Sequence, residues 1–185
     1  NFAVSSAQLI YPAAEISEQI SWAGSEASGT SNMKLMMNGA ITLGTYDGAN
    51  VEIAKLVGEE NIKIFGLRTE EVDALRASGN YWAYDLLKKD PDRLGRIVNQ
   101  LKDGTFARLS GNFDSIYDEL MVGNDHDLVL KDFYSYVDAW EELTQAYGDR
   151  ARWNRAAVHN TARSGYFSSD RTIREYAHDI WHIDA

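Results

Sequence analysis

Residues 24–40 read GSEASGTSNMKLMMNGA and place a glycine-rich, hydroxyl-rich turn directly before a short apolar helix. Such a turn leaves backbone N–H groups free at the start of the helix, where an anion or a sugar can be held. Lys34 lies inside this helix, and its neighbours at positions 33, 35, 36 and 37 are all Met or Leu. We therefore expect the Lys34 amine to be drawn out of water, which makes an amine easier to deprotonate and more reactive. The other interpretation, a helix lysine with its amine in solvent, stays open at this point.

Strands and helices alternate after this stretch. The turn dipeptides Asn38-Gly39 and Asp47-Gly48 bound a strand that we expect over Ile41–Tyr46. A short helix is expected over Asn50–Val57 and a second strand over Ile62–Phe65, each closed by a glycine. This alternation predicts an α/β fold with a parallel sheet, in which both dipeptides serve mainly as turns.

Two more elements are expected on either side of this region. Phe2-Ala3-Val4 has the composition of the end of a strand. Thr69-Glu70-Glu71-Val72 is typical of a helix start, with Thr69 as the cap and the two glutamates facing the positive end of the helix dipole.

The second half of the chain is mostly helical in its pattern. We expect one helix to start at Asp90-Pro91-Asp92, with Asp90 as the cap, and others over about 131–147 and 149–162, with a last one from Ser169-Asp170. No linker composition interrupts the chain, so residues 1–185 are expected to form one unit with a β-containing front and a helical back.

Composition narrows the classes of function. The formal net charge of −10 argues against nucleic acid and against an anionic membrane surface as partners. The chain has no cysteine, which excludes disulfides, thiolate catalysis and thiolate metal sites and fits a reducing, cytoplasmic compartment. The histidines include the i, i+4 pair His178 and His182, but no third ligand accompanies it, so no metal site is expected.

Several runs of sequence occur in an order and spacing that match a known family over essentially the whole chain. They are PAAEISEQIS (12–21), EASGT (26–30), NMK (32–34), NGA (38–40), GTYDGANVE (44–52), EEN (59–61), IFG (64–66) and SGYFSSDRTI (164–173). These runs closely resemble the pyridoxal-phosphate segment and the C-terminal end of the glycogen, or α-glucan, phosphorylases. The resemblance implies the two-domain glycosyltransferase-B architecture, with this chain as the latter part of its Rossmann-like C-terminal domain and a mostly helical C-terminal half.

The resemblance also implies roles for single residues. Lys34 matches the lysine that forms the Schiff base with pyridoxal 5'-phosphate, and Thr30 and Gly29 match positions beside the cofactor phosphate. Glu26 matches the glutamate that binds the glucosyl unit, helped by the backbone N–H groups of Ser28 and Gly29. One charged acceptor with several N–H donors suits a neutral polyol.

Two positions depart from the family pattern. Ser31 stands where phosphorylases usually have glycine, and serine is less free at positive φ. Phe2 stands where a cofactor-contacting tyrosine is usual, so its ring can still pack on the cofactor while one hydrogen bond is lost. Both departures predict small changes in cofactor affinity.

The family reaction implied is phosphorolysis, in which inorganic phosphate attacks the terminal α-1,4-glucosyl unit of a glucan and releases α-D-glucose 1-phosphate. The family also implies a homodimer. Its lysine and arginine for the substrate phosphate would precede Asn1, so this chain alone is expected to be inactive.

Two other functions remain open from the sequence. One is a piece of a pyridoxal-dependent aminotransferase or decarboxylase, which needs an arginine such as Arg68 or Arg163 for a substrate carboxylate. The other is a non-catalytic module that binds glucose through the turn at 26–30 and never holds the cofactor.

Overall fold

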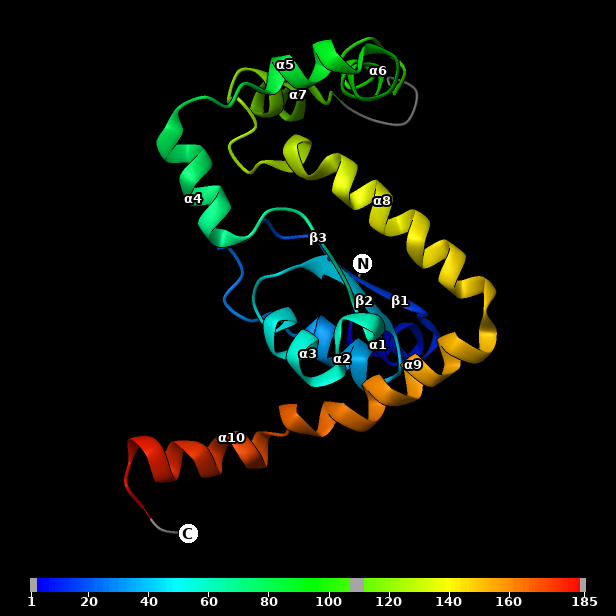
Figure 1. The fold of residues 1–185 in the computed structure, drawn as a ribbon, viewed down its shortest axis with the longest axis vertical. Coiled ribbons are helices and arrows are strands. Elements are labelled where there is room, and N and C mark those ends of the chain that lie inside the picture. Colours follow the sequence, from blue (N-terminus) through cyan, green and yellow to red (C-terminus); the bar gives the residue numbers. More distant parts are fainter. Residues whose placement is uncertain (1–2, 107–111, 184–185) are drawn as a thin grey trace.

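A parallel three-stranded sheet lies at the centre of the structure. The computed structural model describes residues 3–106 and 112–183. Strands β1 (Ile16–Gln19), β2 (Ile41–Thr45) and β3 (Lys63–Phe65) lie in the order β1-β2-β3, and both neighbouring pairs are parallel (Figure 1). The predicted α/β class with a parallel sheet is confirmed.

Helices make up most of the remaining described residues. They are α1 (Val4–Ala13), α2 (Ser31–Met37), α3 (Asn50–Val57), α4 (Thr69–Ser78), α5 (Ala83–Lys89), α6 (Arg96–Asn99), α7 (Asp114–Met121), α8 (Val129–Gly148), α9 (Arg150–Arg163) and α10 (Ser169–Glu175). Shorter helical turns cover Glu59–Asn61, Pro91–Gly95, Ser164–Phe167 and Tyr176–Ile180.

The sheet has a hydrophobic layer on each face. All five residues of β2 are buried, which is the burial expected of a central strand covered on both faces. On one face Leu43 and Phe65 pack against Leu143 of α8 and Trp153 of α9. On the other face Met36 of α2 packs with the apolar side of α3. The sheet is therefore the rigid element from which the connecting loops extend.

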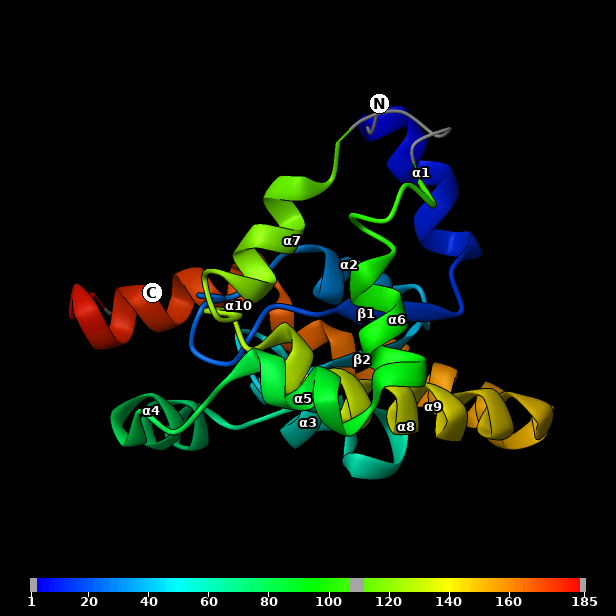
Figure 2. The ribbon, with the colours of Figure 1, turned by 90° about the horizontal axis from the view of Figure 1, so that it is seen from above.

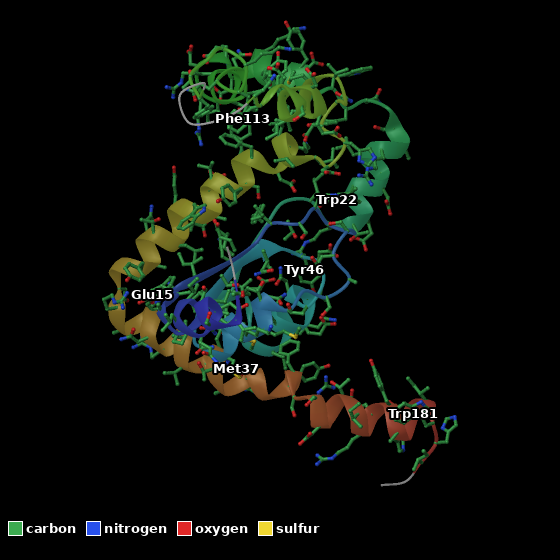
Figure 3. The ribbon with its side chains drawn as sticks, turned by 180° about the vertical axis from the view of Figure 1, so that it is seen from behind. Glu15, Trp22, Met37, Tyr46, Phe113 and Trp181 are labelled. Carbon is green, nitrogen blue, oxygen red and sulfur yellow. The ribbon has the colours of Figure 1, made fainter. Side chains whose placement is uncertain are left out.

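Helix α9 joins these two layers. Its first turns contribute Trp153 to the α8 side, while Asn160, which is fully buried, donates to the Asn61 carbonyl at 2.8 Å near the start of β3. The helices α5, α6, α7 and the first turns of α8 form a second apolar cluster, which lies away from the sheet in Figure 1 and in front of it when the molecule is seen from above (Figure 2). Helix α10 extends away from the body, and both Ile173 in α10 and Trp181, after the helical turn that follows it, are exposed (Figures 1 and 3).

Most of the predicted elements are confirmed. Strand β2, helix α3 and strand β3 lie where the alternation placed them, and α8, α9 and α10 start within two residues of the predicted positions. Asp90 caps as predicted, since its carboxylate accepts the Arg93 N–H at 3.1 Å. The first turn after it, Pro91–Gly95, is a π-helix that continues into α6.

Two predictions at helix starts were wrong. Val4 begins helix α1, closed by a bond from the Ala7 N–H to the Ala3 carbonyl, rather than ending a strand, and Phe2 lies outside the described residues. Thr69 does not cap α4, because the cap is Arg68, whose N–H donates to the Glu71 carboxylate at 2.7 Å. The acid three residues on thus replaces the hydroxyl as the capping group.

No helix in the described ranges 3–106 and 112–183 is long and apolar enough to cross a membrane.

Candidate functional site

The predicted site residues lie at the carboxyl edge of the sheet. In a parallel sheet all strands end at the same edge, and the loops that follow them meet there. Here these loops are the β1–α2 loop (residues 20–30), the β2–α3 turn (residues 46–49) and residues 66–68 after β3. Figure 3 shows Trp22 and Tyr46 at this end of the sheet and Glu15 at the opposite end.

The β2–α3 turn holds the β1–α2 loop through one carboxylate. Asp47 Oδ2 accepts the backbone N–H of Ser25 at 3.0 Å and that of Glu26 at 2.7 Å. A charged acceptor makes such bonds stronger than neutral ones. The loop is therefore fixed at Ser25, which precedes the predicted sugar-binding segment, and at Glu26, which is its first residue.

Gly48 allows the β1–α2 loop to approach the β2–α3 turn closely. Its φ is +51°, and a Cβ built there would lie 2.6 Å from the Ser28 carbonyl oxygen. The next residue, Ala49, donates its N–H to that oxygen at 2.7 Å. Glycine is needed here both for the left-handed backbone and for the close approach.

A buried pair of amides lies beneath the loop. Asn32 Nδ2 donates to Asn50 Oδ1 at 3.1 Å and to the Ser28 carbonyl at 3.4 Å, and Asn50 Nδ2 donates to the Thr45 carbonyl at 3.0 Å. Both side chains are almost fully buried. Buried amides are tolerated when they are hydrogen-bonded, so this pair ties α2, α3 and the end of β2 together under the loop.

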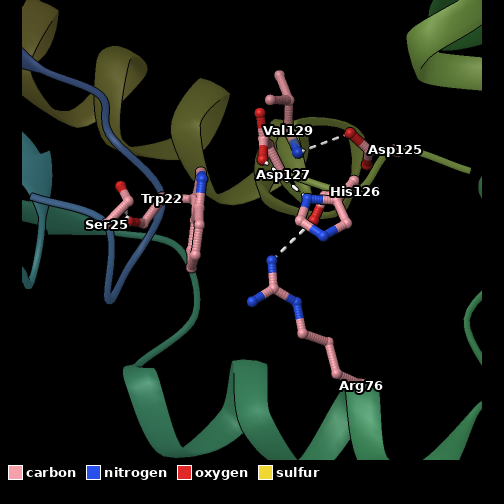
Figure 4. A network of polar contacts seen from close by, with 7 residues as sticks. All are labelled: Trp22, Ser25, Arg76, Asp125, His126, Asp127 and Val129. Atoms are coloured by element: carbon pink, nitrogen blue, oxygen red, sulfur yellow. Dashed lines mark hydrogen bonds and ion pairs between the residues drawn. The ribbon is translucent and has the colours of Figure 1, made fainter. Parts of the chain in front are cut away.

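The other end of the loop rests on distant segments (Figure 4). The Arg76 guanidinium of α4 lies 4.4 Å from the centre of the Trp22 ring and donates to the His126 carbonyl at 2.9 Å. Ser25 Oγ donates to the Trp22 carbonyl at 2.7 Å. Next to this group lies the buried Asp125, whose carboxylate accepts the N–H of Val129, the first residue of α8, at 2.9 Å. Trp22 is thus held between α4 and the turn before α8.

Asp125 belongs to the support of this region rather than to its surface. It also accepts the Tyr81 hydroxyl at 2.6 Å and the Leu130 N–H at 2.9 Å. Burial raises the pKa of the Asp125 carboxyl, opposed by these hydrogen bonds. Burial likewise raises the pKa of the Tyr81 phenol, and the Asp125 carboxylate beside it adds to that shift.

The predicted sugar-binding residues Glu26, Ser28 and Gly29 lie in one exposed loop, together with Thr30, which was predicted to contact the cofactor phosphate. Glu26, Ser28 and Thr30 are exposed, and Gly29 has a φ of +81°. The Glu26 carboxylate accepts only a long bond from the Ser21 hydroxyl, at 3.4 Å, among the contacts of the described residues. The carboxylate and the nearby backbone therefore face solvent at the edge of the sheet, where a polar ligand can reach them.

Lys34 differs from the expectation in one respect. Its side chain is exposed, so its apolar neighbours do not remove it from water in this structure. Of these neighbours Met36 alone is fully buried, whereas Met37 is 57% exposed. Each residue turns about 100° around a helix, so neighbours in sequence face different directions. The Lys34 N–H donates to the Thr30 carbonyl at 3.3 Å, which places Thr30 one turn before the lysine.

The sequence did not assign a site role to Asp47, Asn32 or Asn50. Asp47 was interpreted as a turn residue and Asn50 as the first residue of a helix, and they do lie in the β2–α3 turn and at the start of α3. Asp47 contacts the β1–α2 loop and Asn50 contacts Asn32 of α2, at sequence separations of 18 to 22 residues that turn chemistry alone does not reveal.

The sequence also named two arginines and a histidine pair, of which only Arg68 lies at the carboxyl edge of the sheet. Arg68 follows β3, and its guanidinium lies 3.8 Å from the centre of the Tyr46 ring, whereas Arg163 ends α9. The His182 Nδ1 bonds to the His178 carbonyl at 3.2 Å. Within residues 3–106 and 112–183 no group of three or more His, Cys, Asp or Glu side chains could hold a metal ion.

Comparison with known proteins gives the family. The model of the carbohydrate phosphorylase family matches residues 1–183. Over 183 residues the chain is 50% identical to glycogen phosphorylase of Bacillus subtilis (strain 168), covering 99% of this chain and 23% of that protein. It is 47% identical to glycogen phosphorylase of Haemophilus influenzae and 45% identical to the muscle form of Oryctolagus cuniculus, covering all of this chain and 22% of each relative.

The chain thus spans between a fifth and a quarter of the length of these relatives. The match nevertheless runs from the first residue of the chain to residue 183 and includes every loop at the carboxyl edge of the sheet. This chain belongs to the carbohydrate phosphorylase family.

Proposed function

We propose that the complete natural protein containing this chain is a pyridoxal-phosphate-dependent α-glucan phosphorylase. It would cleave terminal α-1,4-glucosyl units with inorganic phosphate and release α-D-glucose 1-phosphate. Membership of the family and relatives named glycogen phosphorylase support this proposal. The observation that carries it is the exposed loop with Glu26, Ser28 and Gly29, followed one helical turn later by Lys34, at the carboxyl edge of a parallel sheet.

In this proposal residues 1–185 are one unit, the latter part of the Rossmann-like C-terminal domain of a glycosyltransferase-B fold. The strands β1, β2 and β3 with the helices on both faces are consistent with such a domain. We further propose a cytoplasmic homodimer as the form of the complete protein, because the family resemblance implies it.

The donor groups of the site fit pyridoxal phosphate. Lys34 offers an exposed primary amine, which an aldehyde can reach. Thr30, at the start of α2, makes no side-chain bond to that helix, so its hydroxyl is available to a phosphate oxygen. The first N–H groups of a helix lack carbonyl partners inside it, so those of Ser31 and Asn32 suit the same anion, whereas the Met33 N–H donates to Asn32 Oδ1 at 2.9 Å. Lys34 would tether the cofactor, and Thr30 with Gly29 would hold its phosphate.

The cofactor phosphate would supply an acid–base group, because a phosphate monoester has a second pKa of about 6. Lys34 would orient this group rather than attack the substrate. The residue at position 2, Phe2, is proposed to pack on the cofactor ring, although it lies outside the described residues. The serine at position 31 fits the structure without a left-handed backbone, since it begins helix α2.

Glu26 is proposed to accept hydrogen bonds from the hydroxyls of the glucosyl unit, with the backbone N–H groups of Ser28 and Gly29 as donors. A carboxylate makes stronger hydrogen bonds to a hydroxyl than a neutral acceptor does. This set suits a neutral polyol, which agrees with the absence of an ion pair between Glu26 and a lysine, arginine or histidine in the part of the chain that the structure describes.

The experiment that tests the function is a phosphorolysis assay. The complete natural protein is incubated with a maltooligosaccharide and inorganic phosphate, and glucose 1-phosphate is measured. The proposal predicts release by the wild type and none by Lys34→Ala. If neither releases it while glucose still binds both proteins equally, the chain is a sugar-binding module instead. Exchange of the bound cofactor's amino group with amino acids would favour the aminotransferase alternative.

A further inference from the structure

We propose that Asp47 is a positioning residue of this site, which fixes Glu26 for its contact with the sugar. The inference rests on the proposed function and adds a residue to it. Asp47 lies on the β2–α3 turn, 21 positions from Glu26, and acts on it through the backbone rather than through the substrate.

Asp47 controls the direction of the Glu26 side chain through the backbone. Oδ2 of Asp47 takes the N–H groups of both Ser25 and Glu26, at 3.0 and 2.7 Å. The Glu26 carboxylate itself is held only by the 3.4 Å contact with Ser21 among the described residues. An exposed side chain with so weak a contact takes its position from its backbone, and the Asp47 carboxylate fixes that backbone.

Asp47 is itself fixed to the core of the protein. Its N–H donates to the Thr45 carbonyl at 2.9 Å, and its carbonyl accepts the Asn50 N–H at 3.1 Å at the start of α3. Thr45 ends the fully buried strand β2. The carboxylate therefore extends the rigidity of the sheet to a loop that otherwise lies in solvent.

The β1–α2 loop needs the attachment to Asp47, because its buried residue Ala23 holds only the first part of the loop. Ala23 is buried against Val72 of α4 and Leu128, and this fixes only the first part of the β1–α2 loop. From Gly24 to Thr30 the loop is exposed except at Gly29. The Ser28 carbonyl accepts the Ala49 N–H at 2.7 Å and Asn32 Nδ2 at 3.4 Å, whereas the backbone N–H groups of Ser25 and Glu26 are held by Asp47.

The experiment uses the complete natural protein and measures kcat and KM for glucan phosphorolysis. Asp47→Ala removes the acceptor, and a displaced catalytic contact costs up to about 100-fold, so kcat/KM should fall by roughly 10- to 100-fold. Asp47→Asn keeps an oxygen at the same place and should retain activity within about 5-fold of the wild type, because a neutral acceptor bonds about half as strongly. Asp149→Ala is the matched control, since Asp149 also accepts a backbone N–H, that of Arg152 at 3.0 Å, but caps α9 at the opposite end of the sheet.

A double-mutant cycle separates positioning from a direct role. If Asp47 acts through Glu26, adding Asp47→Ala to Glu26→Ala should lower kcat/KM by less than about 3-fold beyond the single Glu26 variant. Full additivity of the two losses would overturn the proposal, because Asp47 would then contribute independently of Glu26. An Asp47→Asn variant as impaired as Asp47→Ala, or an equal loss in the Asp149 control, would also overturn it.

Hydrogen exchange keeps the inference testable if the proposed function fails. Should the wild type show no phosphorolysis, the proposed function is wrong, and the positioning claim is judged on the peptide that covers residues 24–30. Faster amide exchange in this peptide for Asp47→Ala, but not for Asp149→Ala, supports the claim. Unchanged exchange in both variants refutes it.

Discussion

Replacing Gly48 by alanine tests how closely the β2–α3 turn and the β1–α2 loop must approach. Gly48 has a φ of +51°, and an added Cβ would lie 2.6 Å from the Ser28 carbonyl oxygen and 2.9 Å from Glu26 Cγ. Gly79, after α4, has a similar φ of +63° but nothing within 4 Å of an added Cβ. An alanine at either position would therefore carry the same backbone strain, but only the alanine at position 48 would collide with neighbouring atoms.

The expected magnitudes follow from this difference. A left-handed non-glycine residue costs about 1–2 kcal/mol, and Gly→Ala returns about 0.4–1 kcal/mol by restricting the unfolded chain. Gly79→Ala should therefore cost roughly 0–1.6 kcal/mol. Overpacking adds about 1–3 kcal/mol, so Gly48→Ala should cost roughly 1–5 kcal/mol, most of it in local separation of loop and turn.

The assay is hydrogen exchange of the complete natural protein, followed in the peptides around 24–30 and 76–82. A loss of about 1.4 kcal/mol is a tenfold change in an opening equilibrium, so a loss of at least about 1 kcal/mol in Gly48→Ala should speed exchange of the 24–30 peptide at least about 5-fold. Gly79→Ala should change only its own segment, and by less. Equal effects of the two substitutions, or an unchanged 24–30 peptide, would refute the close approach inferred here.

Three further predictions concern other parts of the chain. Asp125→Ala leaves the Tyr81 hydroxyl and backbone donors buried without their acceptor, so the free energy of unfolding should fall by roughly 2–4 kcal/mol, measured by denaturant titration; no loss would contradict the buried network. The pKa of Asp90 is lowered, mainly by the Tyr134 hydroxyl bond, so its contribution to stability is present above the unfolded pKa of about 4 and is lost as pH falls through the folded value. The melting temperature of Asp90→Asn should therefore fall less steeply toward acid pH than that of the wild type. An equally steep fall in both proteins would contradict this. Lys34→Ala should leave the melting temperature of the cofactor-free protein within about 2 °C of the wild type, because the side chain is exposed and alanine favours helix; a large drop would show a packing role for Lys34.

Some elements were predictable because their signals are local. Turn glycines and apolar periodicity placed α3, α8 and both β2 and β3, and Asp90-Pro91 placed a helix start. Strand β1 lacks such signals, since Ser17 is its buried residue and Glu18 is polar. Glu18 is accommodated because Tyr136 and Trp140 of α8 donate to its carboxylate at 2.7 and 2.9 Å, more than 100 residues away.

The same distinction between local signals and contacts of distant residues applies to the candidate site. That Glu26, Ser28, Gly29 and Thr30 share one loop was predictable because they are neighbours in the sequence, while their roles in binding stay predictions. The exposure of Lys34 was not predictable, because it depends on which side of α2 packs on the protein and not on the composition of that helix. The role of Asp47 depends on the parallel pairing of β1 with β2, which brings the two loops to one edge.

The identity of Lys34 as the cofactor lysine is the central claim and can be measured directly. The complete natural protein, loaded with pyridoxal phosphate, is reduced with borohydride and digested, and the modified peptide is identified by mass spectrometry. The account predicts a single reduced pyridoxyl adduct, on Lys34. An adduct on another lysine, or none on a fully folded protein, would contradict it.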